Sequence, residues 1–295
     1  MKAALLPDRG VLSVAGKDAR KFLNGLITFD MSKVTHERAC FAALLSPQGK
    51  ILVDFIVVGN VPPADDGLFL DCPRALSTAL VERLGFYKLR AKIDIADRSD
   101  MLGVTAVWDG AARARFGVPY ADPRLPELGW RSIAAPNPAD AAAAFGAELA
   151  VAAAYEAHRI ALGVPSGGLD FAYGDAFPHE ADMDQLNGVD FRKGCFVGQE
   201  VVSRMEHRRS ARTRVVPVTF AGPAPATGSA VTAGDKAVGT MGSTAAGRGL
   251  ALLRLDRVEE ALAAGTPLLV DGTQLRLKKP AWAHFAFPGE AKAEP

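Results

Sequence analysis

The side chain best suited to chemistry is the thiol of Cys195, which lies in a segment that combines glycines, cations and acids. The segment reads Asp190-Phe191-Arg192-Lys193-Gly194-Cys195-Phe196-Val197-Gly198-Gln199-Glu200-Val201-Val202-Ser203-Arg204. Gly194 and Gly198 flank the thiol, and glycine adopts positive-φ conformations that other residues resist. We therefore expect the thiol to lie on a tight loop. From Gln199 the pattern predicts a short amphipathic helix. The dipole of this helix and the ammonium of Lys193 should favour the thiolate.

The alternative interpretation of Cys195 is a buried, inert side chain in a glycine turn, because unpaired cysteine is among the most buried residue types. Residue types alone leave both interpretations open. The other cysteines, Cys40 and Cys72, lie far away in the sequence, and the chain has no C-x-x-C pair. This spacing indicates neither a disulfide framework nor a self-contained zinc or iron–sulfur site. Free thiols suit a reducing compartment, so we expect a cytoplasmic protein.

A basic run directly follows the cysteine segment and contains one acid, Glu206. Its members are Arg204, His207, Arg208, Arg209, Arg212 and Arg214. Such a run could contact RNA phosphates, pair with the carboxylates of a smaller anionic ligand, or form a solvated linker. No aromatic residue is interleaved for base stacking, and the net charge of +1 gives no global attraction for a polyanion. We therefore do not expect direct nucleic-acid binding.

Two further segments resemble ligand sites only superficially. Residues 177–184 gather one histidine and three carboxylates, but their spacing matches no helical histidine motif or calcium loop. We expect no metal site there, and Asp182 or Asp184 could cap a short helix. The glycines of residues 242–249 are spaced like those of a phosphate loop, but Arg248 and Gly249 stand where lysine and serine or threonine are needed. This segment predicts a hairpin loop.

The elements that must position these residues change in character along the chain. The 295 residues are 49% hydrophobic and 23% charged, which predicts a globular protein of two or three domains. Strands and helices are mixed up to about residue 162, residues 163–190 predict a long loop, and short apolar segments then predict an antiparallel barrel or sandwich. We divide the chain into residues 1–210, a C-terminal domain of 211–288 and a tail of 289–295. The sequence shows neither a secretory leader nor a membrane-spanning run, so we expect no membrane partner.

Elsewhere, the pattern predicts particular elements. Strands are expected around the turn at residues 8–10, and the turn at residues 46–49 should join two strands in a hairpin. A helix should begin at Pro73. Residues 120–138 should form a proline-rich connection. Asn137 should cap a helix that Gly146 ends.

The octapeptide Lys193-Gly194-Cys195-Phe196-Val197-Gly198-Gln199-Glu200 resembles the signature K-G-C-F/Y-x-G-Q-E of the YgfZ-type folate-binding proteins, relatives of the glycine-cleavage T-protein, an aminomethyltransferase. The resemblance covers nearly the whole chain. Its other segments are Gly16-Lys17-Asp18-Ala19, Phe22-Leu23-Asn24-Gly25, Thr28-Phe29-Asp30, Ser46-Pro47-Gln48-Gly49-Lys50 and Arg159-Ile160-Ala161-Leu162-Gly163-Val164-Pro165. It implies an α+β fold: a T-protein-like trefoil of two interwoven α+β subdomains plus a C-terminal antiparallel β-barrel, surrounding a tetrahydrofolate channel.

The resemblance also implies roles for particular residues. Cys195 would be the functional thiol and Lys193 its catalytic neighbour, while Gly194, Phe196, Gly198, Gln199 and Glu200 would shape the loop. The implied folate contacts are Asn24, Asp54, Arg159 and Arg204.

Two departures from the transferase pattern set the expected activity. Val53 replaces the first acid of the T-protein Asp-Asp pair, which leaves Val53-Asp54, and Ala161 replaces its pteridine-binding glutamate. A valine cannot move a proton on a folate nitrogen, so folate binding without aminomethyl transfer is the expectation.

We therefore expect a monomeric, folate-binding accessory protein for the assembly or maintenance of [4Fe–4S] enzymes, including those that thiolate tRNA. Its partners would be iron–sulfur assembly proteins or client enzymes. Cys195 would act as a nucleophile, a redox thiol or a shared cluster ligand. One cysteine cannot hold a cluster alone, so any cluster would be shared with a partner protein or a small thiol. The alternatives are a tetrahydrofolate-dependent aminomethyl or methyl transferase using Asp54 and an RNA-binding module using residues 204–214.

Overall fold

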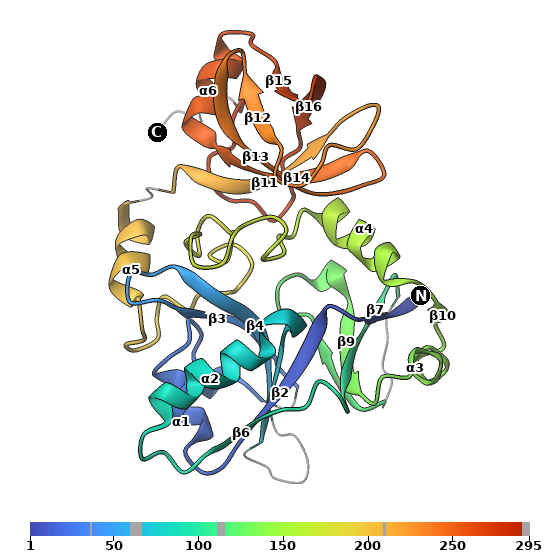
Figure 1. Ribbon diagram of the computed structural model, residues 1–295, viewed down its shortest axis with the longest axis vertical. Coiled ribbons are helices and arrows are strands. Elements are labelled where there is room, and N and C mark those ends of the chain that lie inside the picture. Colours follow the sequence, from blue (N-terminus) through green and yellow to red (C-terminus); the bar gives the residue numbers. More distant parts are fainter. Residues whose placement is uncertain (36, 60–66, 111–115, 209–210, 291–295) are drawn as a thin grey trace. The chain divides into compact units, whose positions relative to one another are not determined.

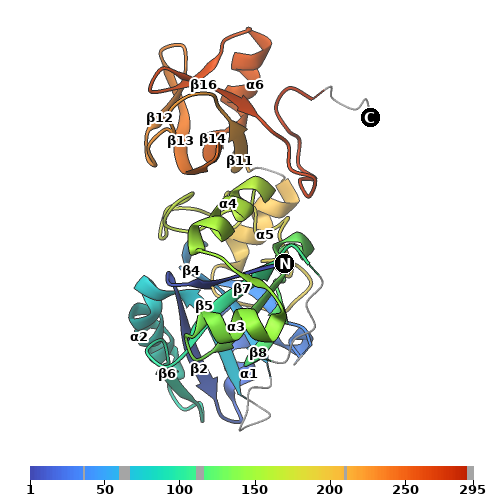
Figure 2. The ribbon, with the colours of Figure 1, turned by 90° about the vertical axis from the view of Figure 1, so that its right-hand side faces the viewer.

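The structure of the chain is a computed structural model that describes residues 1–35, 37–59, 67–110, 116–208 and 211–290. Its contacts divide the chain into two compact units (Figures 1 and 2). Unit 1 comprises Met1–Tyr155 and Leu186–Val201, and unit 2 comprises Glu156–Gln185 and Val202–Pro295. The segment that carries Cys195 therefore belongs to unit 1, although Glu156–Gln185 of unit 2 precede it in the chain.

Unit 1 contains, in its described residues, two five-stranded sheets with the strand orders β10-β1-β7-β9-β8 and β3-β4-β5-β2-β6. The strands are β1 (Lys2–Leu6), β2 (Arg9–Ala15), β3 (Cys40–Leu45), β4 (Ile51–Gly59), β5 (Leu68–Pro73), β6 (Asp94–Asp97), β7 (Gly103–Trp108), β8 (Val118–Ala121), β9 (Trp130–Ala134) and β10 (Glu148–Leu149). Consecutive strands β1 and β2 enter different sheets: β1 pairs with β7, whereas β2 pairs with β5. The two sheets are therefore interwoven, which confirms the predicted α+β architecture.

The helices of unit 1 lie between these strands. They are α1 (Ala19–Asn24), η1 (Met31–Lys33), η2 (Arg74–Leu76), α2 (Ser77–Lys88), η3 (Pro126–Leu128), α3 (Pro138–Phe145) and α4 (Ala152–Leu162), the last of which continues into unit 2. Asn137 caps α3 by accepting hydrogen bonds from two main-chain amides, and Gly146 ends it in the left-handed conformation. Both predictions for α3 are confirmed.

Two predictions for unit 1 are wrong. Pro73 ends strand β5 instead of beginning a helix, because its neighbours pair with β2 and the helix starts only after a 3₁₀ turn. The proline-rich connection of residues 120–138 contains β9 and the end of β8, since both strands pair through their main chains at positions that the prolines leave free.

Strand β4 shows how the sheet separates apolar from polar side chains. Successive side chains of a strand point to opposite faces. Val53, Phe55 and Val57 belong to the hydrophobic core that also receives residues of β2, β3, β5, α1 and α2. Asp54, 7% exposed, alternates with them. The candidate folate contact Asp54 therefore lies on the sheet face opposite this core.

Buried charges join the two sheets of unit 1. Asp71 of β5 accepts hydrogen bonds from Arg9 Nε (2.6 Å), Tyr120 Oη (2.8 Å) and Arg131 Nη1 (2.7 Å). Arg131 of β9 also donates from Nε to Asp122 (2.9 Å). The two arginines hold the pKa of Asp71 below its ordinary value against the opposing effect of burial. We call Arg9, Asp71, Tyr120, Asp122 and Arg131 the arginine network.

Unit 2 contains a closed barrel with the strand order β11-β14-β13-β12-β15-β16. Its strands are β11 (Thr213–Thr219), β12 (Ala230–Ala233), β13 (Lys236–Ala245), β14 (Arg248–Arg254), β15 (Leu268–Val270) and β16 (Thr273–Leu277), with helix α6 (Leu255–Ala263) after β14. Helix α5 (Gln199–Arg208) begins in unit 1 and ends in unit 2. Ala246 and Gly247 join β13 to β14 with positive φ at both positions, as a two-residue hairpin requires. This turn confirms the hairpin predicted for residues 242–249.

Residues 163–190 form turns and isolated bridges without a helix in this described segment. The helix considered at Asp182 or Asp184 is therefore absent from it. In unit 2 the segment is fixed to the barrel through β11, since Val215 N donates to Glu180 O (3.0 Å). No helix among the described residues combines the length and the apolar character needed to cross a lipid bilayer.

Candidate functional site

Residues 193–198, the thiol loop, present Cys195 to solvent. Cys195 is exposed, whereas Lys193 and Phe196 on either side are 6% and 8% exposed. Cys40 and Cys72 are buried in unit 1, and burial raises the pKa of each of these thiols to about 12. The interpretation of Cys195 as a buried hydrophobic side chain is therefore wrong.

Lys193 anchors the loop at one end. Its ammonium donates to the main-chain oxygens of Asn24 (2.7 Å) and Ile27 (2.6 Å), at and just beyond the end of α1, and lies 4.9 Å from the ring centroid of Phe196. Burial lowers the pKa of Lys193 to about 8, although the nearby Asp30 and Asp190 oppose this change. The structure thus gives Lys193 a positioning role, and its expected influence on the thiol stays a prediction.

Residues just before the loop dock on the same part of unit 1. The buried Thr28 donates its hydroxyl to Gly188 O (2.6 Å) and accepts a hydrogen bond from Ala43 N (2.9 Å). Asp190 forms an ion pair with Lys33, and the main-chain amide of Asp190 donates to Thr28 O (2.9 Å). These contacts join a segment late in the chain to η1 and to Thr28, which is itself bound to β3.

Gly198 anchors the loop at its other end. Its φ is +80°, and a Cβ there would lie 2.6 Å from the main-chain oxygen of Ser46 in the β3–β4 turn. Gly49 in that turn also has positive φ, and a Cβ on it would lie 3.0 Å from the side chain of Val201. The predicted hairpin turn forms, with Gly49 N donating to Ser46 O (2.8 Å). Both glycines are required because the turn and the thiol loop approach so closely.

Gly194 differs from Gly198. Its φ lies outside the positive region, and a Cβ at this position would have no neighbour within 4 Å in the described part of the chain. Gly194 therefore does not use the positive φ that a glycine permits, whereas Gly198 does. The packing of unit 1 therefore requires a glycine at position 198 and not at position 194.

Helix α5 begins after the loop. Gln199 N donates to Phe196 O (3.2 Å), and Glu200 stands in the first helical turn, where the helix dipole favours an acid. The predicted helix is confirmed. It starts four residues after Cys195, so the thiol precedes the helix but does not cap it.

The four implied folate contacts have different surroundings. In unit 1, Asn24 accepts a hydrogen bond from Met31 N through Oδ1 (2.9 Å). Asp54 is buried, and its charge adds to that of Asp71 in raising the pKa of Arg9 above its ordinary value, against the opposing effect of burial. Arg204, on the unit 2 part of α5, is exposed.

Arg159 of unit 2 is 2% exposed and uses its guanidinium within the protein. Nε and Nη2 donate to Glu156, Nη1 donates to Val164 O and Asp170, and Nη2 also donates to Ser243. A guanidinium has five N–H donors, and these partners occupy all of them. The sequence did not reveal this because Asp170 and Ser243 are distant in the chain.

The members of the basic run differ in exposure. Arg214 is buried in β11 and paired with Asp182 and Asp184 (2.9 and 2.8 Å). Arg208 is exposed near the end of α5, and Arg209 lies outside the described residues. Arg214 therefore does not contribute to an exposed strip of cations.

A comparison of solved structures defines the class of the fold. The crystal structure of the glycine cleavage system aminomethyltransferase T from Bartonella henselae matches with a TM-score of 0.74 over 97% of this chain and 87% of that chain, at 15% identity. Residues 212–285 match the family described as the CAF17 C-terminal beta-barrel domain. The chain thus has the aminomethyltransferase-like fold with a C-terminal barrel that the resemblance predicted.

Curated relatives define the family within that class. The human mitochondrial iron–sulfur cluster assembly factor IBA57 is 30% identical over 280 residues, which cover 86% of this chain and 78% of the human protein. The mitochondrial IBA57 homologue of Mycosarcoma maydis is 36% identical over 233 residues, and the match spans 57% of that relative. The chain belongs to the IBA57 family of iron–sulfur cluster assembly factors.

The expected cytoplasmic localisation is overturned by these relatives, whose names place them in mitochondria. The expectation depended on free cysteines and on the lack of a secretory leader. Neither feature distinguishes the cytoplasm from the reducing interior of an organelle, so the sequence did not contain the information that the prediction needed.

Proposed function

We propose that this chain supports the assembly or maintenance of [4Fe–4S] enzymes, including those that thiolate tRNA, through Cys195. The observation that carries the proposal is an exposed thiol on a loop that is anchored at both ends. Lys193 is bound to main-chain oxygens, and Gly198 is packed on the β3–β4 turn. The names of its IBA57 relatives support the same role.

Cys195 acts in this proposal as a shared ligand. A [4Fe–4S] cluster takes four thiolates, and Cys40 and Cys72 are buried in strands of unit 1. The remaining ligands must come from an assembly protein, a client enzyme or a small thiol. Gly194 supports this arrangement, because the open space beside it leaves the main chain next to Cys195 accessible to a partner.

The test is the maturation of a [4Fe–4S] enzyme in cells that lack their own copy of this protein. Cys195→Ala should fold as the parent does and fail to restore the activity of the client enzyme. Cys72→Ala is the matched control, since it removes a thiol that lies in the core, and it should restore activity if its stability is sufficient. Full restoration by Cys195→Ala would remove the thiol from the mechanism.

We further propose that unit 1 binds tetrahydrofolate without aminomethyl transfer. Support comes from the shared fold and from Asp54, which lies on the sheet face opposite the core. Val53, which stands where the transferase pattern has its first acid, is 1% exposed and packs in that core. Position 53 and Asp54 therefore lie on opposite faces of the sheet. Calorimetry with tetrahydrofolate should show weaker binding for Asp54→Asn and equal binding for Arg204→Gln if the pterin alone is held. Equal binding by Asp54→Asn would contradict the assigned site.

A further inference from the structure

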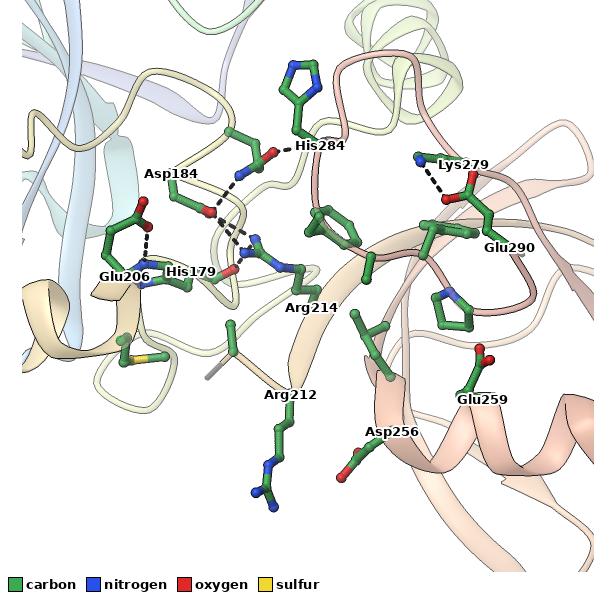
Figure 3. A pocket seen from close by; sticks show the side chains of 18 residues that line it. His179, Asp184, Glu206, Arg212, Arg214, Asp256, Glu259, Lys279, His284 and Glu290 are labelled. Atoms are coloured by element: carbon green, nitrogen blue, oxygen red, sulfur yellow. Dashed lines mark hydrogen bonds and ion pairs between the residues drawn. The ribbon is translucent and has the colours of Figure 1, made fainter. Parts of the chain in front are cut away.

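Three potential metal ligands meet in unit 2, apart from the thiol loop in unit 1. They are His179, Asp184 and Glu206, and one ligand atom from each lies within 4.8 Å of the other two. His179 is 2% exposed, and its Nε2 lies 3.1 Å from Oε2 of Glu206. Figure 3 shows these side chains gathered beside Arg214. The cluster therefore consists of an imidazole nitrogen and two carboxylates, one of which is open to solvent.

Arg214 fixes two of the three ligands. Its Nη1 donates to the main-chain oxygen of His179 (2.8 Å) and to Oδ1 of Asp184 (2.9 Å), and its Nη2 donates to Oδ2 of Asp184 (2.8 Å). A carboxylate has about four acceptor positions. Arg214 occupies two of these positions on Asp184, and Gln185 occupies a third. Among the contacts of the described residues, one acceptor position of Asp184 is left for a cation. Hydrogen-bonded partners of this kind orient metal ligands.

The third ligand comes from a different element. Glu206 projects from the last turns of α5, and its side chain is 45% exposed. His179 and Asp184 belong to the irregular segment of residues 163–190, which is held to β11 through Glu180. An exposed carboxylate opposite two fixed ligands can turn from the imidazole to a bound ion without disturbing the core.

The cluster lies at the wall of a cavity of about 820 Å³ in unit 2. Carboxylates outnumber cationic side chains in the lining: the former are Asp184, Glu206, Asp256, Glu259 and Glu290, and the latter are Arg212, Arg214 and Lys279. Asp184, Asp256 and Glu290 are paired with Arg214, Arg254 and Lys279. The remaining carboxylates, Glu206 and Glu259, outnumber the remaining cation, Arg212, which favours a cation. The cavity also gives water or a small ligand access to coordination positions that the protein leaves open.

We propose that His179, Asp184 and Glu206 bind one divalent first-row transition-metal ion of the Zn²⁺, Fe²⁺ or Mn²⁺ class. An imidazole nitrogen selects against Ca²⁺ and Mg²⁺, which prefer oxygen ligands. Three protein ligands beside a cavity resemble the arrangement that leaves a metal ion an open position. The site requires neither Cys195 nor folate, so it is separate from the proposed function.

Isothermal titration of Zn²⁺ into the full chain carrying Cys195→Ser, which removes the exposed thiol, tests the proposal. One Zn²⁺ should bind per chain. Adding Glu206→Gln removes a ligand from an exposed position where folding is not at risk, and it should weaken binding at least about tenfold. Glu259→Gln is the matched control, because Glu259 lines the same cavity outside the cluster. The Zn²⁺ affinity of this variant should equal that of the Cys195→Ser chain.

A second readout uses Co²⁺, whose visible absorption reports its coordination. The Co²⁺ spectrum should change with Glu206→Gln and stay the same with Glu259→Gln. Absence of Zn²⁺ binding at millimolar concentration would overturn the proposal. So would an affinity that Glu206→Gln leaves unchanged, or an equal loss in both variants, since the latter would indicate only a general effect of cavity charge.

Discussion

The arginine network and the thiol loop both bury cations in unit 1, but with different results. In the network, Arg9 and Arg131 contact the fully buried Asp71, and Arg131 also contacts the buried Asp122, so the two cations meet two carboxylates inside the protein. In the loop, the buried Lys193 contacts main-chain oxygens, and the neighbouring Cys195 remains exposed. The network uses buried charge to join two sheets, whereas the loop uses it to hold a reactive group at the surface.

The largest effect is expected from breaking the network. Asp71→Asn leaves the partly buried Arg9 and the buried Arg131 without their shared carboxylate, and removing one partner of a buried ion pair costs about 3–5 kcal/mol. Denaturant unfolding followed by circular dichroism measures this loss. Asp100→Asn is the control, since the Arg74–Asp100 pair is exposed, and it should change nothing measurable. A small loss for Asp71→Asn would mean that the network does not join the sheets.

The buried lysine of the loop gives the next largest effect, and it depends on pH. Its folded pKa of about 8 lies below its ordinary value of 10.5. Between these values the unfolded state binds more protons than the folded state, so stability rises with pH. A pKa difference of one is worth about 1.4 kcal/mol.

The measurement compares the parent with Lys193→Met from pH 7 to pH 10.5. The difference in their unfolding free energies should move in favour of the parent by about 2–3 kcal/mol, and effects common to both proteins cancel. A constant difference would show that Lys193 is not buried as a charge at neutral pH.

The other anchor of the loop gives a comparable or smaller effect. Gly198→Ala forces a side chain into positive φ, which costs on the order of 1–3 kcal/mol, and places its Cβ against the oxygen of Ser46. We expect reduced stability together with faster proteolysis of the segment around Cys195. Unchanged stability and unchanged proteolysis would show that the β3–β4 turn does not hold the loop.

The sequence predicted the loop better than the network, for a physical reason. The motif around Cys195 is local, so the thiol, the packed Gly198 and the helix at Gln199 were recognisable from neighbouring residues. Asp71 and Arg131 come from strands of different sheets, and no local pattern predicts which buried charges will meet across a fold. Arg159 illustrates the same limit: its resemblance to a folate contact was local, whereas the partners that saturate its guanidinium are remote.

The His179 cluster shows this limit at a candidate site. The sequence between residues 177 and 184 lacks the spacing of a metal motif, and it predicted no metal site. The third ligand of the proposed site, Glu206, lies on α5, and the thiol loop separates it in the sequence from the other two ligands. Sequence spacing describes ligands that share one element, and this cluster is assembled from two.

The smallest structural effect is expected at Gly194, and it separates structure from function within the loop. Gly194→Ala and Gly198→Ala are the same chemical change four residues apart. A methyl group at Gly194 meets no described atom within 4 Å and requires no positive φ, so unfolding should be unaffected. If the main chain beside Cys195 is approached by a partner, Gly194→Ala should still reduce client maturation in cells. Reduced stability would contradict the geometry, whereas full stability with full maturation would show that no partner approaches this side of the thiol.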